Sequence, residues 1–510
     1  MSGASPVGRG AVSVGAVVTT VVIVWSSKPF GPVWRLFLPT ALAHDPLALI
    51  HDFRPFCQDI ARDLARDFAG RDSHPYGGAV TPLVAPPAPV AGQGPGGGVR
   101  LLDDVTDRGA VPTRGDEVAT ADPGEGRLEE FLADPGNTAL DLSTAVARCS
   151  KALGLQHCVV YLADLQQRQL VPLTDVASAL PVDDSLAGWS YRTQSLRVEE
   201  ADTGGITAWL PLLDGAERLG VLAVHCPVLS PTALRRSRAL AALLAMMVTS
   251  ARAYKESFVR RTRTEPMQLP AEMLRAFLPP RTIGTAHVVS TAVLEPAYEL
   301  GGDAFDHALT ETTLHAAVLD AMGHNLASGL TTAVSLAACR NARRTGADLP
   351  ELVQSVDDAL AQWLPDQFCT GVLTQLDLAS GVLRWTNCGH PAPLLIRDQR
   401  LLVDALEREA DPPMGLPSLL TEQGRKVHET ALQPGDRVLL YTDGVTEART
   451  RDGDQFGLER FADYVIRATA AGELAPETLR KLIHSILDAQ PGRLRDDATI
   501  LLVEWWPPTR

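Results

Sequence analysis

Apolar segments that run directly into an acidic residue mark the second half of the chain, and they constrain its fold more than any other feature. The segment GDRVLLYTDGVTEAR, Gly435 to Arg449, reads as a buried strand that ends at Asp443 and Gly444. A second apolar strand, Leu314 to Leu319, ends at Asp320. An Asp-Gly pair after a strand can be an ordinary turn. The repetition of the pattern therefore matters more than either example alone.

Two further acidic positions also lie in a loop or at the end of a strand. Asp303 lies in a loop after Gly301 and Gly302, and the pair Asp496-Asp497 stands immediately before the apolar strand ATILLVEW. In a layered β-structure, the ends of strands that are far apart in the sequence can meet at one edge. The sequence therefore predicts a cluster of carboxylates at one edge of a sheet.

Clustered carboxylates repel one another, so their joint ionisation is favourable only when cations share the site. Mg²⁺ and Mn²⁺ prefer oxygen ligands and keep bound waters, and two such ions about 3.5 to 4 Å apart can activate a water as a nucleophile. The neighbouring glycines would let backbone and ligands approach closely. This pattern is typical of a metal-dependent hydrolase, and phosphate esters are its natural substrates.

The segments around these acids also resemble a known family. ELGGDAFD, VLDAMGHNLASGL, TNCGHPAPLLI, PPMGL, GDRVLLYTDGVTEAR and RDDATILLV occur in the order and at the spacing of PPM-type (PP2C-like) serine/threonine phosphatases, in their SpoIIE/RsbU-like bacterial branch. MQLPAEMLRAFLPP, residues 267–280, is similar to the first helix of that branch. The resemblance covers about residues 265–506, and six motifs in order make it specific.

The resemblance implies an α+β fold in which a β-sandwich of two sheets is flanked by helices, with two Mn²⁺ or Mg²⁺ ions at one edge. It assigns the metal-ligating and catalytic positions to Asp303, Asp320, Asp443 and Asp496, with the carbonyl of Ala321 as a further ligand. Asp497 would be a neighbour of this set rather than a ligand. Water activated between the ions would attack the phosphorus of a phosphoserine or phosphothreonine in line, without a covalent intermediate on the protein.

The chain departs from the family pattern in the turn after Asp320. The usual Asp-x-x-Gly-His-Gly ends here in Asn325, which tolerates a left-handed backbone better than most residues. Met322 stands where eukaryotic members place a proposed general-acid histidine, so His324 is interpreted as a residue that stabilises the turn. His390 is expected to shape a loop near the site, and Asp306 to be either a supporting acid or a helix-start residue.

Residues 131–250 have the order helix, hairpin, irregular middle, hairpin and long helix, which resembles a GAF-like α/β sensor domain. A small-molecule ligand and a purely structural dimerisation role are both open for it. In the helical linker, residues 240–280, the apolar positions Leu240, Leu244, Met247, Ala251, Tyr254 and Phe258 alternate at spacings of four and three. This pattern suits a coiled coil that makes a homodimer, and equally a helix packed on its own domain.

The 510 residues exceed one ordinary core and predict two or three folded units, the last being the phosphatase domain at 281–506. Residues 1–76 form a poorly defined leader whose apolar segment 11–25 is short for a membrane span but could associate with one. Residues 77–130 are a Pro/Gly-rich and acidic linker. The net charge of -15 argues against a nucleic-acid partner, and seven cysteines without a CxxC pair favour the reducing cytoplasm.

The sequence thus predicts a metal-dependent protein phosphatase that is controlled by a GAF-like sensor. The resemblance further implies a phosphorylated anti-sigma-factor antagonist of the STAS type as the substrate. The competing hypothesis is a catalytically inactive regulator that uses a degenerate phosphatase fold only to bind a partner. Retention of all four acidic positions argues against that alternative, because an inactive site has no need to keep repelling carboxylates together.

Overall fold

A computed structural model describes residues 142–507, apart from residues 156, 176, 202–203, 300, 324, 420–423, 450–453, 491–493 and 495. The predicted leader, its apolar segment 11–25 and the Pro/Gly-rich linker lie outside the described residues. None of the helices in the described part of the chain combines the length and the hydropathy that a membrane-spanning helix requires. Residues 120–510 belong to one compact unit, and the description that follows concerns this unit.

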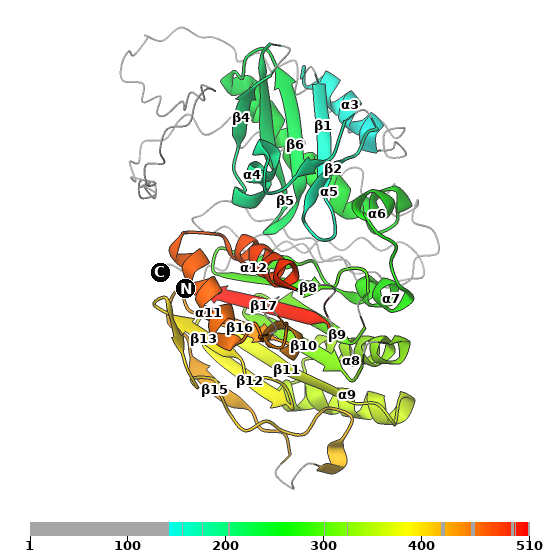
Figure 1. The fold of residues 1–510 in the computed structure, drawn as a ribbon, viewed down its shortest axis with the longest axis vertical. Helices are drawn as coiled ribbons and strands as arrows, with labels where there is room; N and C mark the ends of the chain where they lie inside the picture. Colours follow the sequence, from blue (N-terminus) through cyan, green and yellow to red (C-terminus); the bar gives the residue numbers. More distant parts are fainter. Residues whose placement is uncertain are drawn as a thin grey trace, which may run out of the picture. The chain divides into compact units, whose positions relative to one another are not determined.

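The amino-terminal module, residues 142–262, is built on one antiparallel sheet of six strands in the order β3-β2-β1-β6-β5-β4 (Figure 1). Its elements are α3 (Leu142–Ala152), β1 (His157–Ala163), β2 (Gln169–Pro172), β3 (Leu180–Pro181), α4 (Leu186–Thr193), β4 (Arg197–Glu200), β5 (Ile206–Asp214), β6 (Glu217–Cys226), α5 (Pro231–Ala251) and α6 (Glu256–Thr262). Strands β5 and β6 form a hairpin whose turn contains Gly215 at a φ of +60°. The order of elements is the one that the sequence predicts.

The predicted helical linker is not continuous. Helix α5 ends at Ala251, α6 follows after a short turn, and a third helix, α7 (Leu269–Phe277), begins later. Leu240, Leu244 and Phe258 are buried in the core of the amino-terminal module, whereas Tyr254 of the predicted seam is largely exposed. The seam residues thus pack mainly on their own module, which is the second of the two interpretations. A homodimer stays a prediction.

The carboxyl-terminal module, residues 269–507, contains two antiparallel sheets and further helices (Figure 1). One sheet has the order β15-β12-β11-β10-β9, and the other has the order β14-β13-β16-β17-β8-β7. The strands are β7 (Thr282–Gly284), β8 (Val288–Glu295), β9 (Asp303–Leu309), β10 (Thr313–Ala321), β11 (Cys369–Asp377), β12 (Val382–Cys388), β13 (Leu394–Arg397), β14 (Arg400–Leu402), β15 (His428–Ala431), β16 (Arg437–Tyr441) and β17 (Ala498–Trp505). The helices after α7 are α8 (Leu326–Arg344), α9 (Leu349–Trp363), the short 3-10 helix η2 (Pro417–Leu419), α10 (Asp443–Thr446), α11 (Leu458–Ala470) and α12 (Ala475–Ala489).

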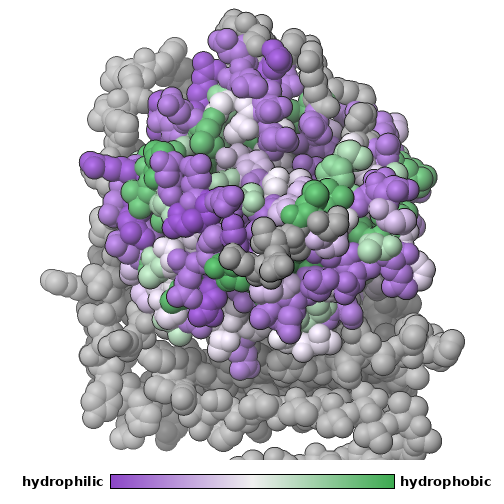
Figure 2. Space-filling view, turned by 90° about the horizontal axis from the view of Figure 1, so that it is seen from below, coloured by the Kyte–Doolittle hydropathy of each residue, from purple (hydrophilic) through white to green (hydrophobic). Residues whose placement is uncertain are grey.

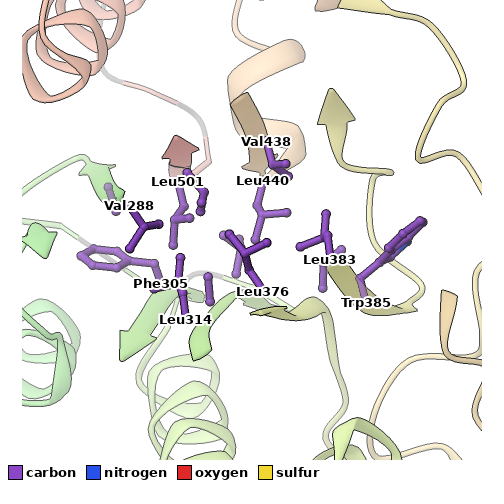
Figure 3. Close-up of a cluster of buried hydrophobic side chains, with 14 of the residues drawn as sticks. Val288, Phe305, Leu314, Leu376, Leu383, Trp385, Val438, Leu440 and Leu501 are labelled. Carbon is purple, nitrogen blue, oxygen red and sulfur yellow. The ribbon is translucent and has the colours of Figure 1, made fainter. Parts of the chain in front are cut away.

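Alternation along the strands divides the apolar side chains between the two faces of each sheet. In β17, Leu501 and Val503 point into the core between the sheets, while Ile500 and Leu502 pack under α11 and α12. On the other sheet, Leu319 belongs to the core beneath α8 and α9. Figure 3 shows the core between the sheets. The module is therefore a two-sheet sandwich with a pair of helices on each outer face, a mixed α+β fold consistent with the PP2C-like prediction.

Figure 2, turned so that the module is seen from below, shows a surface on which hydrophilic residues predominate and hydrophobic residues gather in separate small groups. Scattered exposed apolar side chains are normal in folded proteins.

Candidate functional site

The predicted acids come from both sheets and meet at one end of the sandwich. Asp303 and Asp320 lie directly opposite each other on the neighbouring strands β9 and β10. Asp443 is the first residue of α10, just after β16, and Asp496 lies just before β17. Because β16 and β17 are paired antiparallel neighbours, the end of one and the start of the other lie together. The structure thus brings together acids from four distant places in the sequence.

Asp303 is the most firmly held of these acids. It is only 2% exposed, and its Oδ2 accepts hydrogen bonds of 2.7 Å from the hydroxyls of both Thr442 and Thr499. Thr442 also accepts the backbone N–H of Thr499, so the two threonines form one connected group. Thr499 lies in β17 and Thr442 directly follows β16, two strands of the sheet opposite to that of Asp303. The two threonines join the two sheets at the site, and the sequence analysis did not identify them.

Asp497 lies beside the predicted ligands, as expected, and has a further role there. Its Oδ2 accepts backbone N–H groups of Gly301 and Gly302 at 2.8 Å and of Asp303 at 3.2 Å. Its side chain is buried, so these bonds satisfy a carboxylate that would otherwise be costly to bury. The prediction that it is only a neighbour of the ligands was incomplete, because Asp497 fixes the loop that leads into Asp303.

The carboxylates repel one another. Burial raises the pKa of Asp320 to about 7, and the negative charges of Asp443, Asp496 and Asp497 contribute to the rise. Burial, followed by the charges of Asp320 and Asp497, raises the pKa of Asp303 well above its ordinary value. The pKa of Asp443 is raised by burial and then by Asp496. A bound cation would relieve this repulsion.

Two glycines allow backbone segments to pack closely around the acids. A Cβ added at Gly302 would lie 2.4 Å from the carbonyl oxygen of Ala321, the predicted backbone ligand. A Cβ at Gly444 would lie 1.9 Å from the carbonyl oxygen of Asp497. Gly444 therefore lets the start of α10 pack against the chain that leads into β17.

The turn after Asp320 does not need a glycine at its last position. Asn325 has a φ of −116° and caps α8, since its side chain accepts the N–H groups of Ala327 and Ser328. The left-handed conformation in this turn belongs to Gly323, at a φ of +91°. Asn325 therefore does not use the left-handed conformation that asparagine tolerates, and its amide serves as a helix cap. His324 lies outside the described residues.

His390 shapes the site as expected. Its Nε2 donates to the carbonyl of Tyr441, and its Nδ1 accepts from the hydroxyl of Thr370 at 3.0 Å. Burial lowers its pKa to about 4, so the ring is neutral at neutral pH. It ties the end of β16, immediately before the Thr442–Asp443 pair, to the strand next to Asp320.

Asp306 is neither a helix-start residue nor part of the acidic group. It lies within β9 and forms ion pairs of 2.6 Å with Arg340 and Arg343 of α8. Its carboxylate anchors the helix to the sheet.

The donor chemistry of the acids fits Mg²⁺ or Mn²⁺, because all four side chains offer hard oxygen atoms and their mutual repulsion favours a cation. No group of three or more Asp, Glu, His or Cys side chains in the described part of the chain is arranged to hold a metal ion as it stands. Asp443 and Asp496 are exposed, so their side chains can turn toward a shared ion. Asp303 is already fixed.

Comparison with known proteins finds similarity in the same part of the chain. Residues 310–506 match the family model described as Stage II sporulation protein E (SpoIIE). The chain is 20% identical over 216 residues to phosphoserine phosphatase RsbU of Bacillus subtilis (strain 168), and 26% identical over 155 residues to phosphoserine phosphatase RsbP of the same organism. These alignments cover 42% and 29% of the chain, and 62% and 37% of the relatives, less than two thirds of either relative.

Two solved structures are also similar. The SiaA-PP2C domain of Pseudomonas aeruginosa is 22% identical, with a TM-score of 0.39, and the match covers 46% of this chain and 94% of that one. The PP2C phosphatase domain with a fragment of the regulatory domain of SpoIIE from Bacillus subtilis is 13% identical, with a TM-score of 0.36, over 64% of this chain and 86% of that one.

Proposed function

We propose that this chain is a metal-dependent protein serine/threonine phosphatase of the PPM (PP2C-like) type. The observation that carries the proposal is the meeting of Asp303, Asp320, Asp443 and Asp496 at one end of a two-sheet sandwich. The match of residues 310–506 to the SpoIIE family supports it, and so do two relatives that are named phosphoserine phosphatases.

The four aspartates and the Ala321 carbonyl would hold two Mn²⁺ or Mg²⁺ ions. When bound, such ions activate water and neutralise the charge that develops on a transferring phosphoryl group. Asp303 is held by two threonine hydroxyls, so its position does not depend on the ligand. Asp320, Asp443 and Asp496 are less enclosed, and their carboxylates would orient on binding.

The proposed substrate is a phosphorylated anti-sigma-factor antagonist of the STAS type, which the protein would dephosphorylate in the cytoplasm. The amino-terminal module is proposed to be a GAF-like sensor with a small-molecule ligand, and the chain is proposed to act as a homodimer. The order of elements in the amino-terminal module, a helix, hairpins and a long helix, supports the sensor hypothesis. Nucleic acid is not a proposed partner, given the net charge of -15.

Contacts between the two modules support control of the phosphatase by the sensor. Arg218 of β6 pairs with Glu477 of α12 at 3.0 Å, and both side chains are at most 5% exposed. Glu217, beside Arg218, accepts the backbone N–H of Thr282 at 2.7 Å. These buried polar contacts give the modules one preferred arrangement, which a sensor ligand could change.

The test is release of inorganic phosphate from a serine-phosphorylated STAS protein by the full chain, with and without added Mn²⁺. We expect metal-dependent release that falls by a factor of about 100 or more in Asp443→Ala and in Asp320→Ala, the size of loss typical when one charge-stabilising group is removed from an active site. Asp366→Ala is the matched control, because Asp366 is an exposed acid in the loop after α9.

Equal activity in the Asp443→Ala, Asp320→Ala and Asp366→Ala variants would contradict the assignment of the site. No release by the wild-type chain, together with stable binding of the STAS protein, would instead favour the inactive partner-binding regulator.

A further inference from the structure

A large cavity lies away from the acidic site. It has a volume of about 820 Å³ and is lined by the end of β1, the start of β6, helices α5, α6 and α7, and the loop from α7 to β7. Pockets that bind organic ligands usually measure about 300 to 1,000 Å³, so the cavity is large enough for one.

The lining of this cavity carries a positive excess in a chain that is strongly acidic as a whole. Its charged residues are five arginines and three acids, namely Arg218, Arg252, Arg263, Arg275, Arg281, Asp164, Glu217 and Glu272.

The acids do not neutralise all of these arginines. Glu272 is paired with Arg263 at 2.7 Å. Asp164 accepts the backbone N–H groups of Arg168 and Gln169, and Glu217 accepts that of Thr282. The three carboxylates are thus already engaged, two of them by backbone groups.

Two arginines in the lining have donor groups to spare. The Nη2 of Arg275 is buried without a hydrogen-bond partner, although its Nε donates to the carbonyl of Ala297 at 2.8 Å. The backbone N–H of Arg252 donates to the carbonyl of Val248, but its guanidinium makes no hydrogen bond or ion pair with any other described residue, and its charge acts on Glu217. The hydroxyl of Thr249, also in the lining, is buried and unpartnered.

Unpartnered buried donors are costly, and they are retained most readily where a ligand satisfies them. Burial lowers the pKa of Arg275 to about 10, so its guanidinium remains charged at neutral pH. A guanidinium presents a fork of N–H groups that matches carboxylate, phosphate or sulfonate oxygens.

The remainder of the lining is largely apolar, and it includes Leu219, Val248, Phe258, Leu294 and Phe305. Apolar walls with a few convergent polar groups are typical of sites for organic molecules. A bare inorganic anion would leave these walls without a partner.

We propose that this cavity binds a small organic anion, in which an apolar body carries a carboxylate, phosphate or sulfonate group that Arg252 and Arg275 hold. The ligand touches α5 and α6 of the amino-terminal module and α7 of the carboxyl-terminal module at once. It therefore links the two modules, independently of what the acidic site does.

The test is a fluorescence titration of the full chain, without added metal ions, with 8-anilinonaphthalene-1-sulfonate, which combines an aromatic body with one sulfonate. We expect saturable binding of one molecule per chain. Loss of one charge-assisted contact should weaken binding about tenfold or more in Arg252→Met and in Arg275→Met. Citrate, which has the charge without the apolar body, should compete only weakly.

Arg238→Met is the matched control, because Arg238 is exposed on α5, the helix that contributes Val248 and Thr249 to the lining, but does not itself line the cavity. Its affinity should equal that of the wild type. If Arg275→Met loses its cooperative thermal transition, Arg252→Met decides, since it removes a guanidinium that bonds no other described residue and keeps the backbone bond to Val248.

Absence of saturable binding to the wild type, or equal affinity in Arg252→Met and Arg238→Met, would overturn the proposal. Because no substrate is turned over, the result does not depend on whether the chain is a phosphatase.

Discussion

The hydroxyl of Thr499 donates a 2.7 Å hydrogen bond to Oδ2 of Asp303, a residue 196 positions away and in the other sheet. Both side chains are buried, so no water competes for the bond. The acid with the least freedom at the site is therefore positioned by a residue that has no part in the predicted ligand set.

Thr499→Val should reduce phosphatase activity about tenfold or more, because a hydrogen bond to a charged group contributes about 1.5 to 3 kcal/mol. Thr499→Ser keeps the hydroxyl and should restore most of the activity. The measurement is kcat and KM for a phosphoserine protein at several Mn²⁺ concentrations. We expect a higher Mn²⁺ requirement in Thr499→Val, which a general loss of folded protein would not produce.

Thr374→Val is the control for this series, since Thr374 is a buried threonine that bonds the carbonyl of Ala316 at 2.9 Å. If it lowers activity and raises the Mn²⁺ requirement as much as Thr499→Val does, the bond to Asp303 has no special role.

Gly444→Ala should be more damaging than its small size suggests. The new Cβ would lie 1.9 Å from the carbonyl oxygen of Asp497, and backbone must move to accept it. Overpacking of this kind costs about 1 to 3 kcal/mol or more, and the shift would move Asp443 relative to Asp496. Chemical denaturation and phosphatase assays should both show the loss.

Gly329→Ala provides the comparison for Gly444→Ala. Gly329 lies in α8, where its Cβ would lie 3.2 Å from the flexible end of Met273 and 3.3 Å from the carbonyl oxygen of Gly301, far looser than the 1.9 Å contact at Gly444. Alanine also favours a helix over glycine by about 1 kcal/mol, so Gly329→Ala should lose much less stability than Gly444→Ala. Equal loss of stability in the two variants would argue against a special constraint at Gly444.

The acids that follow strands could be found from the sequence because strand ends are visible in it, while their assignment as metal ligands stays a prediction. An apolar run followed by an acid identifies Asp320 and Asp443, and the alternation of β17 places Leu501 and Ile500 on opposite faces. Thr499 could have been noticed, since a polar residue two positions before Leu501 falls on the inner face. Nothing in one sequence indicates that its hydroxyl reaches Asp303.

The sequence also could not decide whether the predicted helical linker is a coiled coil or a helix packed on its own domain. Leu240 and Leu244 have the spacing of a coiled coil, and the same spacing serves a helix packed on its own sheet. Only the position of the core decides between them, and both residues are fully buried in the amino-terminal module. The role of Asp497 was missed likewise, because its partners are backbone N–H groups, which every sequence contains.

Asp306→Asn should destabilise the carboxyl-terminal module and change its response to acid. Burial raises the pKa of Asp306, but the hydrogen bonds and charges of Arg340 and Arg343 outweigh this and leave it below the ordinary value. The stability from a lowered pKa is present above the unfolded-state pKa, about 4, and is lost as pH falls through the folded-state pKa. The difference between wild type and variant should therefore shrink below about pH 4.

Urea denaturation at pH 7, 5, 4 and 3 measures this effect. At pH 7 we expect a loss of about 2 to 3 kcal/mol, below the usual range for a fully buried pair because both arginines are partly exposed. Glu429→Gln, at an exposed pair with Arg384 on the same sheet, should change stability by less than about 1 kcal/mol. A constant difference between wild type and Asp306→Asn over the whole pH range would contradict the role assigned to this carboxylate.

Arg218→Met should weaken the connection between the two modules. Arg218 donates to Glu477 at 3.0 Å and to the Pro476 carbonyl at 3.0 Å, and it lies over the ring of Tyr191. The substitution removes these bonds, but Glu477 keeps Arg480 as a partner and is not left as an unpaired buried charge. The loss in free energy of unfolding should therefore be about 2 to 3 kcal/mol. If the modules communicate through this contact, the phosphatase rate should also change by a factor of about two or more.

Arg235→Met, at an exposed position on α5, is the matched control and should leave both stability and rate unchanged. The double variant Arg218→Met/Glu477→Gln should lose less stability than the sum of the losses in the two single variants, because each single variant already breaks the bond that the two residues share. Strict additivity would show that Arg218 and Glu477 contribute independently. An unchanged rate in Arg218→Met, despite a measured loss of stability, would show that the contact holds the modules together without controlling catalysis.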